Sequence, residues 1–163
     1  MIATLRFAVA TLGFCAASFA PLLHAQGNQG VAGTWALVKN TTEMDGKVTH
    51  TYGEQPKGQA IFTPDGRYTL VITRPDLPKF ASNNRLKGTA EEKAAVNDGM
   101  LAHFGRYNVD GKMIVMDIES SSFPNWNGTT QKREFQVSGN ELRWITPNSS
   151  GGGVSTLVWR RAN

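Results

Sequence analysis

Two short runs of strand-forming residues, joined by a turn, form the clearest pattern in this chain. Gln59–Thr63 and Arg67–Thr73 flank the tetrapeptide Thr63-Pro64-Asp65-Gly66. Proline presets the backbone angle at the second position of a tight turn, and glycine suits the fourth. The second run is almost all β-branched or aromatic, which is typical of a strand buried on at least one face. One hairpin cannot bury its own apolar face, so the pattern predicts a larger sheet.

Further strand-like runs continue to the end of the chain, and Asp45-Gly46, Asp110-Gly111 and Ser138-Gly139-Asn140 are hairpin turns between neighbouring runs. The other predicted strands are Val31–Lys39, Lys47–Tyr52, His103–Val109, Lys112–Glu119, Gln131–Val137, Glu141–Thr146 and Val154–Arg161. We therefore predict an all-β fold, an up-and-down antiparallel barrel of about eight strands, because closure removes exposed strand edges. Such a barrel is filled by side chains or holds one small ligand. A sandwich of two sheets is the alternative.

One short helix interrupts the strands. Thr89 and Glu92 form a capping box, in which each side chain satisfies a backbone N–H at the start of a helix. The helix is predicted over about Ala90–Leu101, with Val96 and Met100 on one face. It would act as a lid or cap the core with these two residues.

The N-terminal segment differs in composition from the rest of the chain. Arg6 is the only charged side chain near its start, and Phe7–Leu23 consists mainly of apolar and small residues. Ala25 is a small residue of the kind that signal peptidase prefers at its cleavage site. We expect residues 1–25 to be a signal peptide and residues 26–163 to be the mature domain. This domain would be periplasmic or secreted, without a stable membrane anchor. A buried N-terminal helix is the alternative.

Composition narrows the classes of function. The 163 residues include 17 Lys and Arg against 13 Asp and Glu, a formal net charge of +4, and these charges are scattered. A scattered excess is typical of a solvated surface and does not predict nucleic-acid binding. The only cysteine, Cys15, lies in the N-terminal segment. The mature domain is therefore expected to have no disulfide and no cysteine nucleophile.

Spaced motifs run through essentially the whole mature chain. They are Tyr52-Gly53-Glu54, Pro56, Gly58, Ile61, Thr63-Pro64-Asp65-Gly66, Arg74-Pro75-Asp76, Pro78-Lys79-Phe80, Gly88-Thr89, Phe104-Gly105, Tyr107, Val109, Phe123-Pro124-Asn125-Trp126, Gln131, Arg133, Phe135, Leu157-Val158-Trp159 and Arg161. Together they resemble the bacterial and fungal lipocalin-like domain family. The resemblance implies a lipocalin-like barrel, but a fold does not fix an activity.

A shorter motif extends this resemblance. Gly33-Thr34-Trp35 is similar to the G-x-W of lipocalins, in which the tryptophan plugs the barrel floor and a late arginine packs on it. Arg160 or Arg161 would be that arginine. The chain departs from the family pattern at His50 and His103, where Tyr-like residues are expected.

Motifs for metal binding and for common catalytic chemistry are missing. His50 and His103 are far apart without ligand spacing, so neither a metal nor a cofactor is predicted. No G-x-S-x-G occurs, and Gly151-Gly152-Gly153 lacks the lysine and hydroxyl residue of a phosphate loop.

Arg133 is the first candidate site residue. Alternation puts it on the same face as Phe135 and Val137, so an inward face would carry a guanidinium into the barrel. A buried charge needs a partner, which would be Asp117, Glu119 or an anionic or polar ligand. A register bulge that exposes Arg133 is the alternative, and both interpretations stay open.

Tyr107 and His103 form a second candidate, because they share one face of their strand. An inward pair would bind a carbonyl or hydroxyl group, or act as acid and base. The alternative is a core tyrosine whose hydroxyl is satisfied by the backbone.

Two irregular loops supply the remaining candidates, since loops at a barrel rim commonly carry binding residues. Phe80 and Trp126 would line a mouth, with Asn125 beside Trp126, and Arg74 and Lys79 would meet an anionic group. The alternative is that these loops plug one end of the barrel for stability.

Two functions follow from these observations. The first is a secreted binding protein that holds a small, mainly apolar ligand in the barrel or at its mouth. The second is a cofactor-free isomerase, cyclase or lyase that uses acid–base groups in the barrel. A structural or interaction role also fits a filled barrel. Neither the identity of the ligand nor the oligomeric state follows from the sequence.

Overall fold

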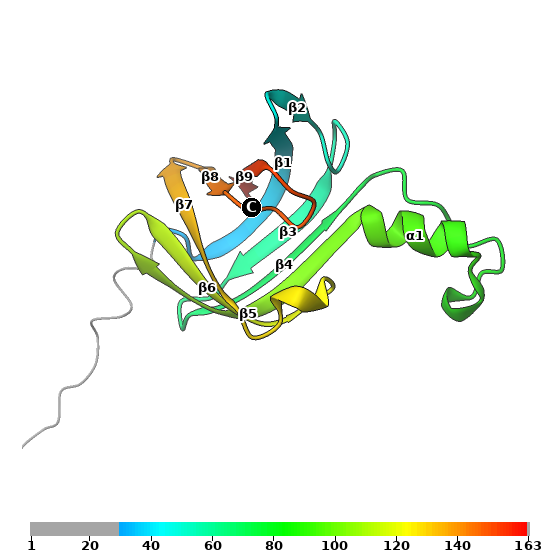
Figure 1. The fold of residues 1–163 in the computed structure, drawn as a ribbon. Helices are drawn as coiled ribbons and strands as arrows, with labels where there is room; N and C mark the ends of the chain where they lie inside the picture. Colours follow the sequence, from blue (N-terminus) through cyan, green and yellow to red (C-terminus); the bar gives the residue numbers. More distant parts are fainter. Residues whose placement is uncertain (1–29, 163) are drawn as a thin grey trace, which may run out of the picture.

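A computed structural model describes residues 30–162 of the chain (Figure 1). Within these residues, nine strands form one antiparallel sheet in the order β2-β1-β3-β4-β5-β6-β7-β8-β9, and β1 also pairs with β9. This last pairing closes every strand except β2 into a barrel. The predicted all-β, up-and-down barrel is therefore confirmed, and the two-sheet sandwich is wrong. The predicted signal peptide, residues 1–25, lies outside the described residues.

The strands are β1 (Gly33–Met44), β2 (Lys47–Thr49), β3 (Lys57–Phe62), β4 (Arg67–Thr73), β5 (Met100–Asp110), β6 (Met113–Ser121), β7 (Thr130–Ser138), β8 (Glu141–Thr146) and β9 (Val154–Arg161). The helices are α1 (Ala90–Asp98) and the short 3-10 turns η1 (Arg85–Lys87) and η2 (Pro124–Trp126). β1 is longer than predicted, because its second half pairs with both β2 and β9.

The helix differs from the prediction in length and in role. The capping box is present, with Glu92 N donating to Thr89 Oγ1 at 3.2 Å and Thr89 N donating to Glu92 Oε2 at 2.9 Å. However, α1 ends at Asp98, and Met100 begins β5 opposite Thr73. α1 projects beyond the barrel and contains no buried residue, so it does not cap the core (Figure 1). No helix within residues 30–162 combines the length and the apolar character needed to cross a membrane.

The two ends of the barrel are built differently. At one end, short turns join β3 to β4, β5 to β6 and β7 to β8. At the other end lie the long connections, which are residues 74–99 with α1, residues 122–129 with η2, and residues 147–153 (Figure 1). We call these the turn end and the loop end.

Trp35 forms the floor of the barrel at the turn end. Its side chain is fully buried, and its Nε1 donates to the carbonyl of Val31 at 2.8 Å. The guanidinium carbon of Arg161 lies 4.2 Å from the centre of the indole ring. Gly33 has a φ of +131°, and a side chain there would collide with Arg161. The predicted floor is therefore confirmed, with Arg161 as the packing arginine.

Candidate functional site

A cavity of about 270 Å³ lies inside the barrel towards the loop end. Apolar side chains from four strands form much of its wall, since alternate residues of a strand point to the same face. These are Leu70 and Ile72 on β4, Leu101 on β5, Trp144 on β8 and Leu157 on β9. Trp126 of η2 also lines the cavity.

Polar residues on the neighbouring strands β7, β8, β9 and β1 also line the cavity. Thr146 lies opposite Ser155 in the β8–β9 register, and Ser155 lies opposite Thr42 in the β9–β1 register. Arg133 donates from Nη1 to Thr146 Oγ1 at 3.2 Å, and Asn40 donates from Nδ2 to Ser155 Oγ at 2.7 Å. All five residues line the cavity and are at most 9% exposed. We call these five residues the polar band.

Arg133 points into the barrel. Its side chain is 4% exposed, so the inward interpretation is confirmed and the exposing bulge is wrong. Besides the bond to Thr146, its Nη2 donates to Gln131 Oε1 at 2.6 Å, and its guanidinium carbon lies 5.8 Å from the ring centre of Trp126. Burial lowers the pKa of Arg133 to about 10, so the group is still a cation at neutral pH.

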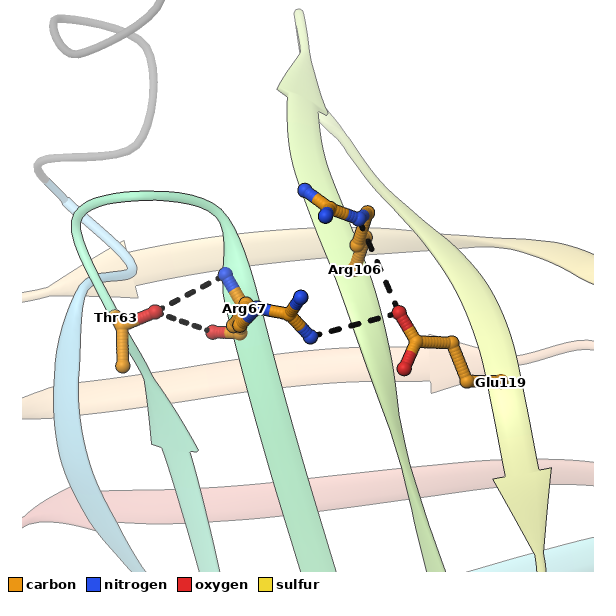
Figure 2. Close-up of polar contacts among 4 residues, drawn as sticks. All are labelled: Thr63, Arg67, Arg106 and Glu119. Atoms are coloured by element: carbon orange, nitrogen blue, oxygen red, sulfur yellow. Dashed lines mark hydrogen bonds and ion pairs between the residues drawn. The ribbon is translucent and has the colours of Figure 1, made fainter.

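The predicted acidic partners do not meet this guanidinium. Asp117 accepts a hydrogen bond from Thr130 Oγ1 at 2.6 Å. Glu119 is exposed on β6, with a carboxylate oxygen 3.6 Å from Arg67 Nη1 and 3.9 Å from Arg106 Nε (Figure 2). Both acids occupy the outward positions of β6, because the alternate residues of that strand face the core. Within residues 30–162, no ion pair joins the buried arginine to a carboxylate.

His103 and Tyr107 both point inward, as predicted, but they do not form a pair. Tyr107 donates its hydroxyl to the carbonyl of Thr63 at 2.9 Å, near the turn end, which matches the alternative of a core tyrosine. His103 lines the cavity, and its Nδ1 lies 3.0 Å from the hydroxyl of Tyr68. Burial, reinforced by the charge of Arg133, lowers the pKa of His103 to about 3, while burial raises the pKa of Tyr68. The two partners are therefore neutral at pH 7.

The predicted rim residues separate into two groups. Trp126 lines the cavity and packs edge-on against His103, with ring centres 5.8 Å apart. The others, which are Arg74, Lys79, Phe80 and Asn125, do not line it. Arg74 instead forms an ion pair with Asp76 at 2.9 Å. Thus three predicted residues meet at the cavity, and five lie elsewhere.

Sequence reasoning missed most of the polar band and Tyr68. The alternation in Arg67–Thr73 places Tyr68 on the inward face, so this signal was present. Asn40 was missed because the first strand was predicted to end at Lys39. The Oδ1 atom of Asn40 is buried without a hydrogen-bond partner among the described residues. Within residues 30–162, no three His, Cys, Asp or Glu side chains gather to hold a metal ion.

Comparisons with known proteins show what this chain is similar to. The lipocalin-like domain model matches residues 32–162. The 4'-hydroxy-3'-methoxypropiophenone carrier protein of Aspergillus oryzae is 33% identical over 102 residues, which are 55% of this chain and 92% of that protein. Among solved structures, the fluorescent protein UnaG matches 83% of this chain and 99% of its own at 14% identity, with a TM-score of 0.39.

Proposed function

Because this chain belongs to the lipocalin-like domain family, we propose that it is a carrier for one small, mainly apolar molecule with a polar head. The observation that carries this proposal is the cavity, which combines apolar walls with the polar band. Ligand pockets typically combine such apolar walls with a few polar groups that fix orientation.

The size of the cavity supports a ligand with one substituted ring. An apolar cavity of about 150 Å³ accommodates benzene. The volume here is about 270 Å³, which leaves room for a ring and short substituents. The name of the Aspergillus oryzae relative describes a ligand of this kind, a single ring with hydroxyl, methoxy and ketone groups.

The experiment is native mass spectrometry of the protein purified from its own host, followed by extraction of bound molecules. A thermal-shift panel of 4'-hydroxy-3'-methoxypropiophenone, aromatic acids, fatty acids and terpenoids tests binding directly. We expect one stoichiometric molecule or a clear stabilisation by at least one compound class. A protein without any bound molecule that responds to no class in the panel would contradict the proposal.

A pair of variants on β4 assigns the binding to the cavity. Leu70→Trp adds atoms on the inward face of the strand, where Leu70 lines the cavity. Val71→Trp adds the same atoms on the outward face, where Val71 is 40% exposed. We expect the first variant to lose binding and the second to keep it. Equal binding by the two variants would contradict an internal site.

A cofactor-free isomerase, cyclase or lyase is the second candidate, because Tyr68 and His103 form a hydrogen-bonded pair at the cavity. General acid–base catalysis works best when the pKa of the group lies near the working pH. Burial moves the pKa of both groups away from neutrality, that of His103 to about 3. This favours binding over catalysis. Turnover of a bound compound that His103→Gln abolishes, without loss of binding, would favour the enzyme instead.

We further propose that the carrier acts in the periplasm or outside the cell. The support is the apolar segment Phe7–Leu23 followed by Ala25 in the sequence. N-terminal sequencing of the protein isolated from its host tests this, with a mature chain expected to begin at Gln26. Recovery of an uncleaved chain from the cytoplasm would contradict export.

A further inference from the structure

We propose that the polar head of the ligand is a carboxylate and that Arg133 binds it. This inference rests on the proposed carrier function and names the chemical class of its ligand. It is carried by the charges that line the cavity and by the partners of Arg133.

The cavity carries positive charge without a compensating acid. Of the described residues that line it, Arg133 and Lys47 are basic, and none is Asp or Glu. The other titratable side chains among them are His103 and Tyr52. His103 is neutral at pH 7, and burial raises the pKa of Tyr52 to about 12, so neither supplies a negative charge.

The hydrogen bonds of Arg133 neither neutralise its charge nor use all of its N–H donors. A guanidinium has five N–H donors. Two bonds are made, to the neutral oxygens of Thr146 and Gln131. A cation with 4% exposure and only neutral partners is strongly unfavourable, and an anion that enters the cavity removes much of this penalty.

A carboxylate fits the guanidinium better than other heads. Its two oxygens match the planar fork of arginine, which lets them accept two parallel hydrogen bonds. Trp126 lies beside the guanidinium, and Trp144 forms part of the apolar wall. A flat apolar body attached to the carboxylate therefore has a surface to pack against.

The experiment compares cinnamate with cinnamamide, which have nearly the same shape but differ in charge. Binding to the full chain is measured by titration calorimetry at pH 7 and low salt. We expect the wild type to bind cinnamate at least about tenfold more tightly than cinnamamide, since hydrogen bonds to charged groups are the stronger ones. Acetate, which lacks the apolar body, is the control for a site that takes any small anion.

Two arginine variants assign the preference. Arg133→Met removes the cavity charge, and Arg143→Met makes the same substitution on the exposed face of β8. We expect the first to lose the preference, so that its affinities for cinnamate and cinnamamide lie within about threefold of each other. The second is expected to behave as the wild type. Arg133→Lys, which keeps the charge without the fork, is expected to keep part of the preference.

The outcomes separate this inference from the proposed function. The carboxylate proposal is wrong if the wild type binds the two compounds equally or if the preference survives Arg133→Met. Either result leaves the proposed carrier function standing. Binding of acetate as tight as that of cinnamate also overturns the carboxylate proposal. If the wild type binds neither compound and no other class in the thermal-shift panel, the carrier proposal fails as well. If Arg133→Met does not fold, Arg133→Lys decides, and an unchanged preference in that variant overturns the role of the arginine fork.

Discussion

Each end of the barrel holds an arginine beside a tryptophan, but their partners differ. At the turn end, Arg161 lies 4.2 Å from the ring centre of Trp35 and donates to the backbone carbonyls of Ala32 at 2.9 Å and Gly30 at 3.2 Å. At the loop end, Arg133 lies 5.8 Å from Trp126, and its bonds go to side-chain oxygens. The arginine at the floor is thus satisfied by the backbone, whereas the arginine at the cavity has no acidic partner among residues 30–162.

Two residues of β5 repeat this difference. Tyr107, near the floor, donates to the backbone carbonyl of Thr63 at 2.9 Å. The ring nitrogen Nδ1 of His103, four residues earlier, instead lies 3.0 Å from a side-chain group, the hydroxyl of Tyr68. A backbone carbonyl is held in place by the fold, whereas a side-chain partner can change its rotamer. We therefore expect the turn end to contribute stability and the loop end to hold the ligand of the proposed carrier.

Tryptophan substitutions give the largest expected contrast between the ends. Trp35→Ala should lower the free energy of unfolding by about 3–5 kcal/mol, because a fully buried ring leaves a cavity. Trp126→Ala, at a half-buried ring, should lower it by less than about 2 kcal/mol and should weaken ligand binding instead. Urea unfolding measures both. Equal losses of unfolding free energy in the two variants would contradict the different roles of the two ends.

Substitution of the two arginines is expected to change the free energy of unfolding differently at the two ends. Arg161→Met should lower the free energy of unfolding by about 1–3 kcal/mol, because charge-assisted bonds to two carbonyls are lost. Arg133→Met should leave it unchanged or raise it by about 1–4 kcal/mol, since an apolar residue of similar volume replaces an uncompensated charge. The same urea titrations apply. A large loss of stability in Arg133→Met would mean that Thr146 and Gln131 already satisfy the guanidinium of Arg133.

Acid should weaken the loop end through His103. Its folded pKa of about 3 lies below the ordinary value of 6.5, so the unfolded state binds more protons between these values. This contribution to stability is fully present above pH 6.5 and is lost as the pH falls towards 3. We expect a loss of about 2 kcal/mol between pH 7 and pH 5. His103→Gln, which keeps a hydrogen-bonding side chain, should remove this part of the pH dependence, and an unchanged profile would contradict the assignment.

The smallest effect is expected in the long connection that carries α1. Thr89→Ala removes the capping box of a helix without buried residues. It should fray the helix locally, by about 0.5–2 kcal/mol, and change global unfolding by less than about 0.5 kcal/mol. Hydrogen exchange of the α1 amides measures the first value and urea unfolding the second. A global loss as large as the local one would show that the loop end also supports the barrel.

The sequence by itself determined the local features of this protein, namely its turns, its helix start and the alternation along its strands. The turn at Thr63-Pro64-Asp65-Gly66, the capping box at Thr89 and the hairpin at Asp110-Gly111 depend on neighbouring residues, so their signals are readable in one window. The period of two along a strand likewise put His103 and Tyr107 on one face, and both are inward. The end of α1 was misjudged because pairing of Met100 with Thr73 outweighs helix continuation.

Only the tertiary structure decided which inward residues share the cavity. Thr42 and Ser155 are 113 positions apart, and they meet because β1 pairs with β9 and closes the barrel. The β8–β9 register places Thr146, the partner of Arg133, opposite Ser155, while Tyr107 is left near the floor. Alternation fixes the face of a residue but not its height along the barrel. That height depends on the strand register across the whole sheet, including the β1–β9 pairing that closes the barrel.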